Sequence, residues 1–318
     1  MLKIFTFTFS SMLVIFTYML IGFILNKKKI LPECTDRALS RLENFVLIPA
    51  LVISTFSTQC TFASLKENYT LIIYSIITFF AAFLISLFIS GFFAQKGTYR
   101  NSIFRYSFVF ANFGFVGNAL IPLLFPENSS EMLYKYMLFT LPLQIAAYTW
   151  GISTLIPQKG GKISFLSRLN NPTFYAIIIG IILGVTNSTS FIPSFISQCL
   201  SLLGSAMAPL AMILTGFVIG GYPFFELFKE KKLYLSVFLR LFIIPAVILI
   251  VLYFLNASQF IMALALFAYA TPMGMNTVIF PSAYGGETKT GAAMLLISSL
   301  LCIFSIPIMY SLFTLVIK

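Results

Sequence analysis

Histidine is absent from this 318-residue chain, and charged residues of both signs are scarce. Charged residues make up 9% of the sequence, whereas a typical soluble domain contains about a quarter. Because so few charges cannot keep a surface of this size solvated, a soluble globular protein is excluded. Apolar and aromatic residues account for 59% of the chain, and its mean hydropathy is +0.97. This composition indicates an all-α integral membrane protein that lies almost entirely in the bilayer.

The missing histidine also removes several kinds of reactive site. No His general base is available, and the four scattered cysteines and single Asp form no set of transition-metal ligands. We therefore expect no enzymatic activity, no metal and no cofactor. The formal charge of +11 does not indicate a nucleic-acid partner, because the basic residues are not gathered on one folded surface.

Ten stretches of the chain are long and apolar enough to cross a bilayer as helices, which takes about 20 mostly apolar residues. They lie near 4–25, 38–58, 69–93, 102–125, 131–156, 172–187, 193–220, 232–254, 258–281 and 289–316. The first stretch lacks a charged leading region and a cleavage site, so it is interpreted as a span and not as a removable signal.

The positive charges predict how these spans are oriented. Most Lys and Arg residues lie in the odd-numbered loops, for example Lys27, Lys28 and Lys29 in the first loop. Cytoplasmic loops carry such an excess, so both termini are expected outside a cell membrane that the chain crosses many times. Arg240 lies just inside the eighth stretch and is expected to reach water at the cytoplasmic end.

Short sequence matches indicate an internal repeat. IGFIL at 21–25 matches IGIIL at 179–183, and FTLPL at 139–143 matches FSIPI at 304–308, at offsets of about 160 residues. Five spans is an odd number, so the second copy enters the membrane from the opposite face, as in many secondary transporters. The predicted organisation is a first five-helix repeat at 1–157, a cytoplasmic linker at 158–171 and a second, inverted five-helix repeat at 172–318.

The fourth span contains residues that interrupt a helix. It reads ANFGFVGNALIPLLF at 111–125 and contains Asn112, Gly114, Gly117, Asn118 and Pro122. Gly and Pro weaken helices, and an interrupted segment in a membrane is tolerated only where it is buried in protein or lines a wet cavity. We expect a break in the helix at this point.

The ninth span has the same character. It reads ATPMGMNTVIFPSAYGG at 270–286 and contains Thr271, Pro272, Gly274 and Asn276. Two breaks at equivalent places in inverted halves predict a binding site near the midplane of the membrane. The helix restarting after each break has a positive dipole end, which suits a carboxylate.

The amide side chains near the breaks have two interpretations. Asn112, Asn118 and Asn276, with Gln144 in the fifth span and Asn44 in the second, could orient a polar substrate. Alternatively, they satisfy the broken backbone or bond between helices. Direct contact with substrate is favoured for Asn112 and Asn276, and the structural role is favoured for Gln144 and Asn44.

At these residues the sequence resembles the auxin efflux carrier family in its short bacterial form. The matching stretches are RLENFVLIPALVISTF at 41–56, ANFGFVGNALIPLLF at 111–125, NNPTFYAIIIGIILG at 170–184, GSAMAPLAMILTGFVIG at 204–220 and ATPMGMNTVIFPSAYGG at 270–286. The resemblance implies the bile-acid symporter type of fold, ten helices in which the fourth and ninth cross at their breaks. It also implies transport of organic anions such as auxin, malate or malonate.

The sequence departs from the family at one point. Ala119 stands where members often have Pro, and Pro122 follows three residues later, so a softer or lower break is expected in the fourth helix. The long cytoplasmic loop of plant members is also absent.

The chain offers no obvious intramembrane acid. No Asp or Glu lies in the middle of a predicted span, and Glu43 lies near the end of one. Proton-coupled carriers normally need an ionisable residue in the membrane, so the sequence disfavours proton coupling. The leading hypothesis is efflux of a small organic anion driven by the membrane potential, and sodium-coupled symport is the alternative. A channel and a membrane enzyme are the competing classes. The expected partners are the anion and membrane lipid, with a homodimer compatible with related folds.

Overall fold

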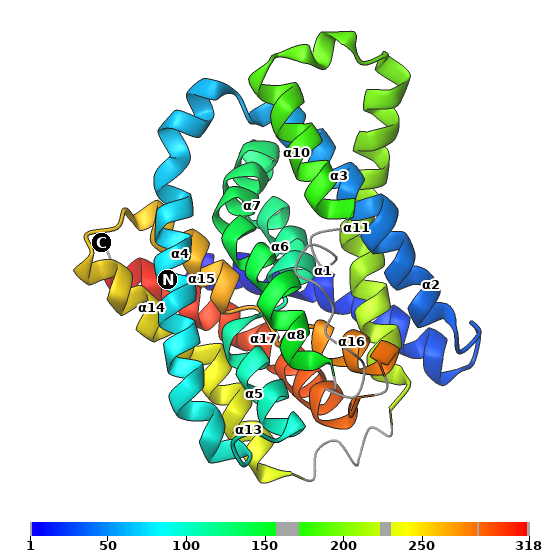
Figure 1. Cartoon of the computed structure of the whole chain (residues 1–318), viewed down its shortest axis with the longest axis vertical. Helices are drawn as coiled ribbons and strands as arrows, with labels where there is room; N and C mark the ends of the chain where they lie inside the picture. The colour runs from blue at the N-terminus through cyan, green and yellow to red at the C-terminus, as the bar shows by residue number, and fades with distance from the viewer. Residues whose placement is uncertain (1, 157–171, 223–229, 285, 317–318) are drawn as a thin grey trace.

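The computed structural model describes residues 2–156, 172–222, 230–284 and 286–316, and these residues are almost entirely helical (Figure 1). The first half contains α1 (Leu2–Lys27), α2 (Thr35–Leu42), α3 (Ile48–Gln59), α4 (Phe62–Phe93), α5 (Tyr99–Val109), α6 (Asn118–Leu124), α7 (Ser129–Ala146) and α8 (Ile152–Leu155). The second half contains α10 (Pro172–Val185), α11 (Ser194–Gly220), α13 (Lys231–Phe238), α14 (Ile244–Phe254), α15 (Gln259–Tyr269), α16 (Asn276–Tyr284) and α17 (Lys289–Val316). The predicted linker at 158–171 lies outside the described residues.

Several helices continue through a single π-helical turn. The turn η1 (Glu43–Leu47) joins α2 to α3, η4 (Ala147–Gly151) joins α7 to α8, and η6 (Leu239–Ile243) joins α13 to α14. A fourth turn, η2 (Phe113–Gly117), leads into α6. Pro49 and Pro245 are the second residues after η1 and η6, and each removes one backbone donor from its helix. Such π-turns are frequent at functional sites.

Polar residues in the sequence set where several helices begin. The hydroxyls of Thr61, Thr98 and Ser258 accept hydrogen bonds from backbone N–H groups in the first turns of α4, α5 and α15. These residues therefore act as N-caps, which satisfy donors that a helix start leaves without partners.

Six continuous helical segments in the described part of the chain are long and apolar enough to cross a membrane. They are Leu2–Lys27, Thr35–Gln59, Phe62–Phe93, Ser194–Gly220, Lys231–Phe254 and Lys289–Val316. Three shorter apolar helical segments, Phe113–Leu124, Pro172–Val185 and Gln259–Tyr269, accompany them. Together with exposed apolar side chains such as Phe80 and Phe88 on α4, they define an all-helical, multi-pass membrane protein.

The helices can be described as two groups, which contact each other through α1 and α17 and through α3 and α7. In the first group α1 packs against α11, and α3 packs against both α10 and α11. In the second group α4 packs against α5, α7 and α14, while α17 packs against α13 and α15. Figure 1 shows α2, α3, α10 and α11 at the upper right and α4, α5, α13 and α14 at the lower left.

Glycines permit close helix contacts in the first group. A Cβ on Gly22 of α1 would lie 1.9 Å from the carbonyl oxygen of Ile213 in α11. A Cβ on Gly180 of α10 would lie 2.8 Å from the Cβ of Phe56 in α3. Small residues allow membrane helices to approach in this way. Gly22 and Gly180 occupy the same position in the matching IGFIL and IGIIL stretches.

Candidate functional site

The fourth predicted span is interrupted in the structure. Helix α5 ends at Val109, and Phe110 adopts extended backbone angles before the chain turns into η2 and α6. The backbone N–H of Asn112 donates to the carbonyl oxygen of Pro272 at 2.7 Å. The prediction of a break is confirmed. The chain regains helical geometry at Phe113, so this break is short.

The ninth predicted span is also interrupted. Helix α15 ends at Tyr269, and α16 begins only at Asn276. Within the gap, the N–H of Met273 donates to the hydroxyl of Ser298 on α17 at 3.0 Å. This break is therefore longer than the one in the fourth span, and another helix supplies one of its hydrogen-bond partners.

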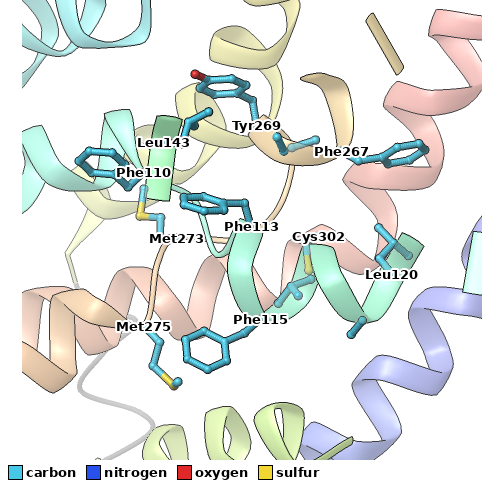
Figure 2. Packing of buried hydrophobic residues seen from close by; sticks show 14 of the residues in the cluster. Phe110, Phe113, Phe115, Leu120, Leu143, Phe267, Tyr269, Met273, Met275 and Cys302 are labelled. Carbon is cyan, nitrogen blue, oxygen red and sulfur yellow. The ribbon is translucent and has the colours of Figure 1, made fainter. Parts of the chain in front are cut away.

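The two interruptions meet. Ala111 and Met273 form an antiparallel β-bridge that belongs to no strand in the described part of the chain. Figure 2 shows the apolar side chains around this crossing, with Phe113 and Phe115 from the first segment and Met273 and Met275 from the second. Backbone groups freed by each break are thus partly satisfied by the other break, as a low-dielectric interior requires.

A cavity of about 40 Å³ lies at this point, and we call it the crossing cavity. It is lined by Ile48, Tyr106, Ala111, Asn112, Phe113, Gly114, Phe115, Asn118, Gln144, Ala147, Tyr148, Gly274, Met275 and Asn276. A water molecule needs about 10–15 Å³ of such volume, so the cavity has room for about two or three waters. This volume is too small to hold a dicarboxylate.

Six of the ten predicted site residues line the crossing cavity: Asn112, Gly114, Asn118, Gln144, Gly274 and Asn276. Asn112 is 2% exposed, and its Nδ2 has no hydrogen-bond partner among the described residues. The Oδ1 of Asn118 is likewise buried without a partner there. Asn276 differs, because its Nδ2 donates to the hydroxyl of Tyr106 at 2.9 Å.

The other four predicted residues do not line the cavity. Gly117 lies against the ring of Tyr136, and Pro122 is half-buried within α6. Thr271 is fully buried, and its hydroxyl donates to Ala268. Pro272 contributes the carbonyl that holds the N–H of Asn112. These four residues shape the breaks through backbone and packing, because their polar groups are absent or already paired.

Sequence reasoning missed two tyrosines at the cavity. Tyr106 lies on α5 before the break and accepts the amide of Asn276. Tyr148 lies in η4, and its hydroxyl donates to Oδ1 of Asn44 at 3.4 Å. Asn44 also donates to the backbone carbonyl of Ser40 at 2.7 Å. Tyr106 lies six residues before Asn112, on the last turn of α5. Its position close to the predicted break is the one signal in the sequence that could have identified it.

Arg240 does not reach water, contrary to the expectation from sequence. It is fully buried in η6, and its Nη1 donates to the carbonyl oxygen of Tyr269 at 2.8 Å. Tyr269 is the last residue of α15, and its ring lies 5.9 Å from the guanidinium carbon. The helix leaves its last carbonyls without internal partners and carries a negative dipole there, so a buried cation is stabilised at this end.

A second, much larger cavity of about 1050 Å³ opens at the ends of α1 and α11. We call it the large cavity, and it is lined by Asn26, Lys27, Lys29, Ile30, Leu31, Pro32, Glu33, Asp36, Arg37, Ser40, Arg41, Phe217, Val218, Gly220, Gly221, Tyr222, Val278 and Ile279. Val278 and Ile279 belong to α16, which starts at the crossing. The large cavity therefore extends from the odd-numbered loops toward the interrupted helices.

The described residues contain no cluster of three or more Cys, Asp or Glu that could hold a metal ion. The polar chemistry at the crossing consists of amides, tyrosine hydroxyls and backbone groups. These groups can bind an oxyanion through hydrogen bonds, and they contain no nucleophile paired with a general base.

Comparison with known families agrees with this architecture. The sequence profile of a family described as membrane transport protein matches residues 7–165 and 160–310, which together cover nearly the whole chain. The chain therefore belongs to a family of membrane transporters. More narrowly, it is a member of the auxin efflux carrier family, as its sequence motifs indicated. A search of curated proteins found no match to the chain.

Proposed function

We propose that this protein is a secondary transporter of small organic anions, which bind where the two interrupted helices cross. The observation that carries the proposal is the meeting of two breaks beside buried amide atoms without partners, at Asn112 and Asn118. A carboxylate accepts hydrogen bonds, and Nδ2 of Asn112 can donate one. The start of α16 adds the positive end of a helix dipole.

Alternating access would follow if the chain is an inverted repeat of five plus five helices. The contact of α1 with α11 corresponds to that of α10 with α3, because α1 and α10 carry the matched glycines Gly22 and Gly180. Residues 1–157 and 172–318 would then be the two repeats. In such folds one helix group rocks against the other around a fixed site. The crossing cavity is lined from both groups, with Ile48 on the first and the interrupted helices on the second.

The charge distribution supports an orientation with both termini outside the cell. Lys27, Lys29, Arg37 and Arg41 line the large cavity, and cytoplasmic loops are enriched in such residues. In this orientation the large cavity opens to the cytoplasm, where its positive charges would attract an organic anion before export.

The membrane potential supplies a driving force for this export. An anion that leaves a cell with a negative interior gains roughly 2.3 kcal/mol per charge per 100 mV. The alternative mechanism is sodium-coupled symport, in which carbonyl groups freed by the breaks would coordinate the ion. Carbonyls at Phe110 and Ala111, which lie beside Gly274, are the relevant groups for that alternative.

The experiment is flux in proteoliposomes loaded with an acid chosen by a thermal-shift screen of mono- and dicarboxylates. Saturable efflux that becomes severalfold faster when a potential is imposed is expected. Flux that does not change with the membrane potential would contradict the proposed driving force. A strict sodium requirement would favour sodium-coupled symport. Flux that never saturates would indicate a channel, and chemical conversion of the acid would indicate an enzyme.

A further inference from the structure

Glu43 lies deep in the packed protein although it is near the end of its predicted span. It opens the π-turn η1 in the continuous helical segment Thr35–Gln59. The residue is 1% exposed, and neither Oε1 nor Oε2 has a hydrogen-bond partner among the described residues. It is also the one buried carboxylate in the part of the chain that the structure describes. The sequence disfavoured proton coupling because it offered no obvious acid inside the membrane, and the buried Glu43 removes that objection.

The position of Glu43 links the two cavities. Ser40 lines the large cavity, and Ile48 of the same continuous helix lines the crossing cavity. Ser40, Glu43, Leu47 and Ile48 are all buried, and their spacing places them along one side of the helix. Glu43 thus lies between the entrance to the protein and the proposed anion site. Glu43 and Ile48 lie at opposite ends of the π-turn η1.

No cation in the described part of the chain compensates a charge at this place. The elements packed against η1 are α2, α3, α10 and α11. Their titratable or charged residues are Asp36, Arg37 and Arg41 on α2, Cys60 at the end of α3, Tyr175 on α10 and Cys199 on α11. Tyr148 of η4, whose hydroxyl donates to Asn44 within η1, is a further titratable group at this place. The three ionised groups on α2 line the large cavity, and the described residues of α3, α10 and α11 carry no Lys or Arg.

Burying an ionised carboxylate without a partner costs several kcal/mol, whereas the neutral acid avoids most of that cost. The carboxyl is therefore protonated in the conformation described here. An ionised Glu43 would require water or a cation to reach it, and the large cavity begins one helical turn away, at Ser40.

We propose that Glu43 is a proton-binding site, and that its proton and the transported anion bind cooperatively. This inference rests on the proposed function, because it needs an anion at the crossing. An anion and an ionised Glu43 repel each other across a low-dielectric interior. The anion therefore binds more tightly when the carboxyl is neutral. By linkage, anion binding raises the proton affinity of Glu43, and proton binding raises the affinity for the anion.

The proposal is compatible with export driven by the membrane potential when the substrate is a dicarboxylate. A dianion and one proton still carry one net negative charge outward. A monocarboxylate would move without net charge and would not respond to the potential. The proton site therefore favours a dicarboxylate as the substrate class.

The first test needs no substrate. Infrared spectra of the purified protein near neutral pH should contain the carbonyl stretch of a protonated carboxyl group. Glu43→Gln should remove this band, whereas Glu127→Gln, which changes an exposed carboxylate, should leave it. Identical spectra of the wild type and Glu43→Gln would overturn the proposal, whatever the protein transports.

The second test uses malate in proteoliposomes. Wild-type affinity for malate should be nearly constant while Glu43 of the free protein stays protonated, and it should fall by up to about tenfold per pH unit above the pH at which the infrared band disappears. Glu43→Gln should still transport malate with a flat pH profile, and Glu43→Asp should restore the slope. An unchanged slope in Glu43→Gln would overturn the linkage. A protein that shows the infrared band and moves no carboxylate would contradict the proposed function and leave the proton site standing.

Discussion

The two interrupted segments at the crossing differ in how they are held. Three side chains from other helices form hydrogen bonds with the interrupted segment of the ninth span. Arg240 donates to the carbonyl of Tyr269, and Tyr106 accepts from the side-chain amide of Asn276. Ser298 accepts from the backbone N–H of Met273. The fourth segment receives one such contact, from the hydroxyl of Tyr136 to the carbonyl of Phe113 at 3.1 Å.

This difference indicates that the two segments have different roles, one structural and one in contact with the ligand. The polar groups of the ninth segment are largely occupied by protein partners, so this segment fixes the geometry of the crossing. The fourth segment keeps buried amide atoms at Asn112 and Asn118 without partners in the described part of the chain. A buried polar group without a partner is costly, so these atoms are the ones that a ligand would stabilise most.

The largest expected effect comes from packing in the fourth segment. In Gly117→Ala the new Cβ would lie 1.9 Å from the hydroxyl oxygen of Tyr136, a fully buried side chain. The ring would have to leave the carbonyl of Phe113, so the variant should lose about 2–4 kcal/mol of folding stability. Thermal or denaturant unfolding in detergent measures the loss.

Matched alanine substitutions show whether the clash is the cause. A Cβ on Gly114 would have no neighbour within 4 Å, and a Cβ on Gly274 of the ninth segment would have its nearest neighbour at 3.4 Å. Both variants should remain within about 0.5 kcal/mol of the wild type. Equal losses in all three variants would show that helix breaking matters more than the Tyr136 contact.

Replacing the two asparagines tests which segment contacts the anion. Asn112→Ala removes a free buried donor and should weaken anion binding by about 10- to 100-fold, the value of a hydrogen bond to a charged group. Asn276→Ala should also impair transport while the protein remains folded, but by less, because its amide already bonds to Tyr106. Flux titrations with both variants provide the measurement. A larger loss for Asn276→Ala would reverse the assigned roles, and undiminished flux in both would indicate that the amides are structural.

The smallest expected effect is that of Tyr106→Phe. The substitution removes the hydroxyl that accepts the amide of Asn276 and keeps the buried ring. One neutral hydrogen bond contributes about 0.5–1.5 kcal/mol, so anion affinity should change by about 2- to 10-fold. If Tyr106 acts by orienting Asn276, its effect should disappear in the Asn276→Ala background. Additive losses would mean that the hydroxyl contacts the anion itself.

Local sequence was sufficient to predict where the helices break. Gly114, Gly117 and Pro272 weaken a helix, and both breaks occur in the stretches that contain them, although Gly114 and Gly117 themselves lie in the π-turn η2 after the first break. The interruption itself lies before Phe113, whereas Ala119 and Pro122 lie within helix α6. The predicted site residues supplied six of the fourteen residues that line the crossing cavity, whereas Tyr106 and Tyr148 escaped notice because tyrosine is common in membrane helices.

Composition and spacing alone determined that this chain is a helical membrane protein with two interrupted spans, since hydropathy and backbone propensity are local properties. Tertiary structure decided which polar groups lose their access to water. Arg240 and Glu43 both lie near the ends of apolar stretches in the sequence, and both are buried in the fold. Burial depends on which helices pack around a residue, and that information is spread over segments far apart in the chain.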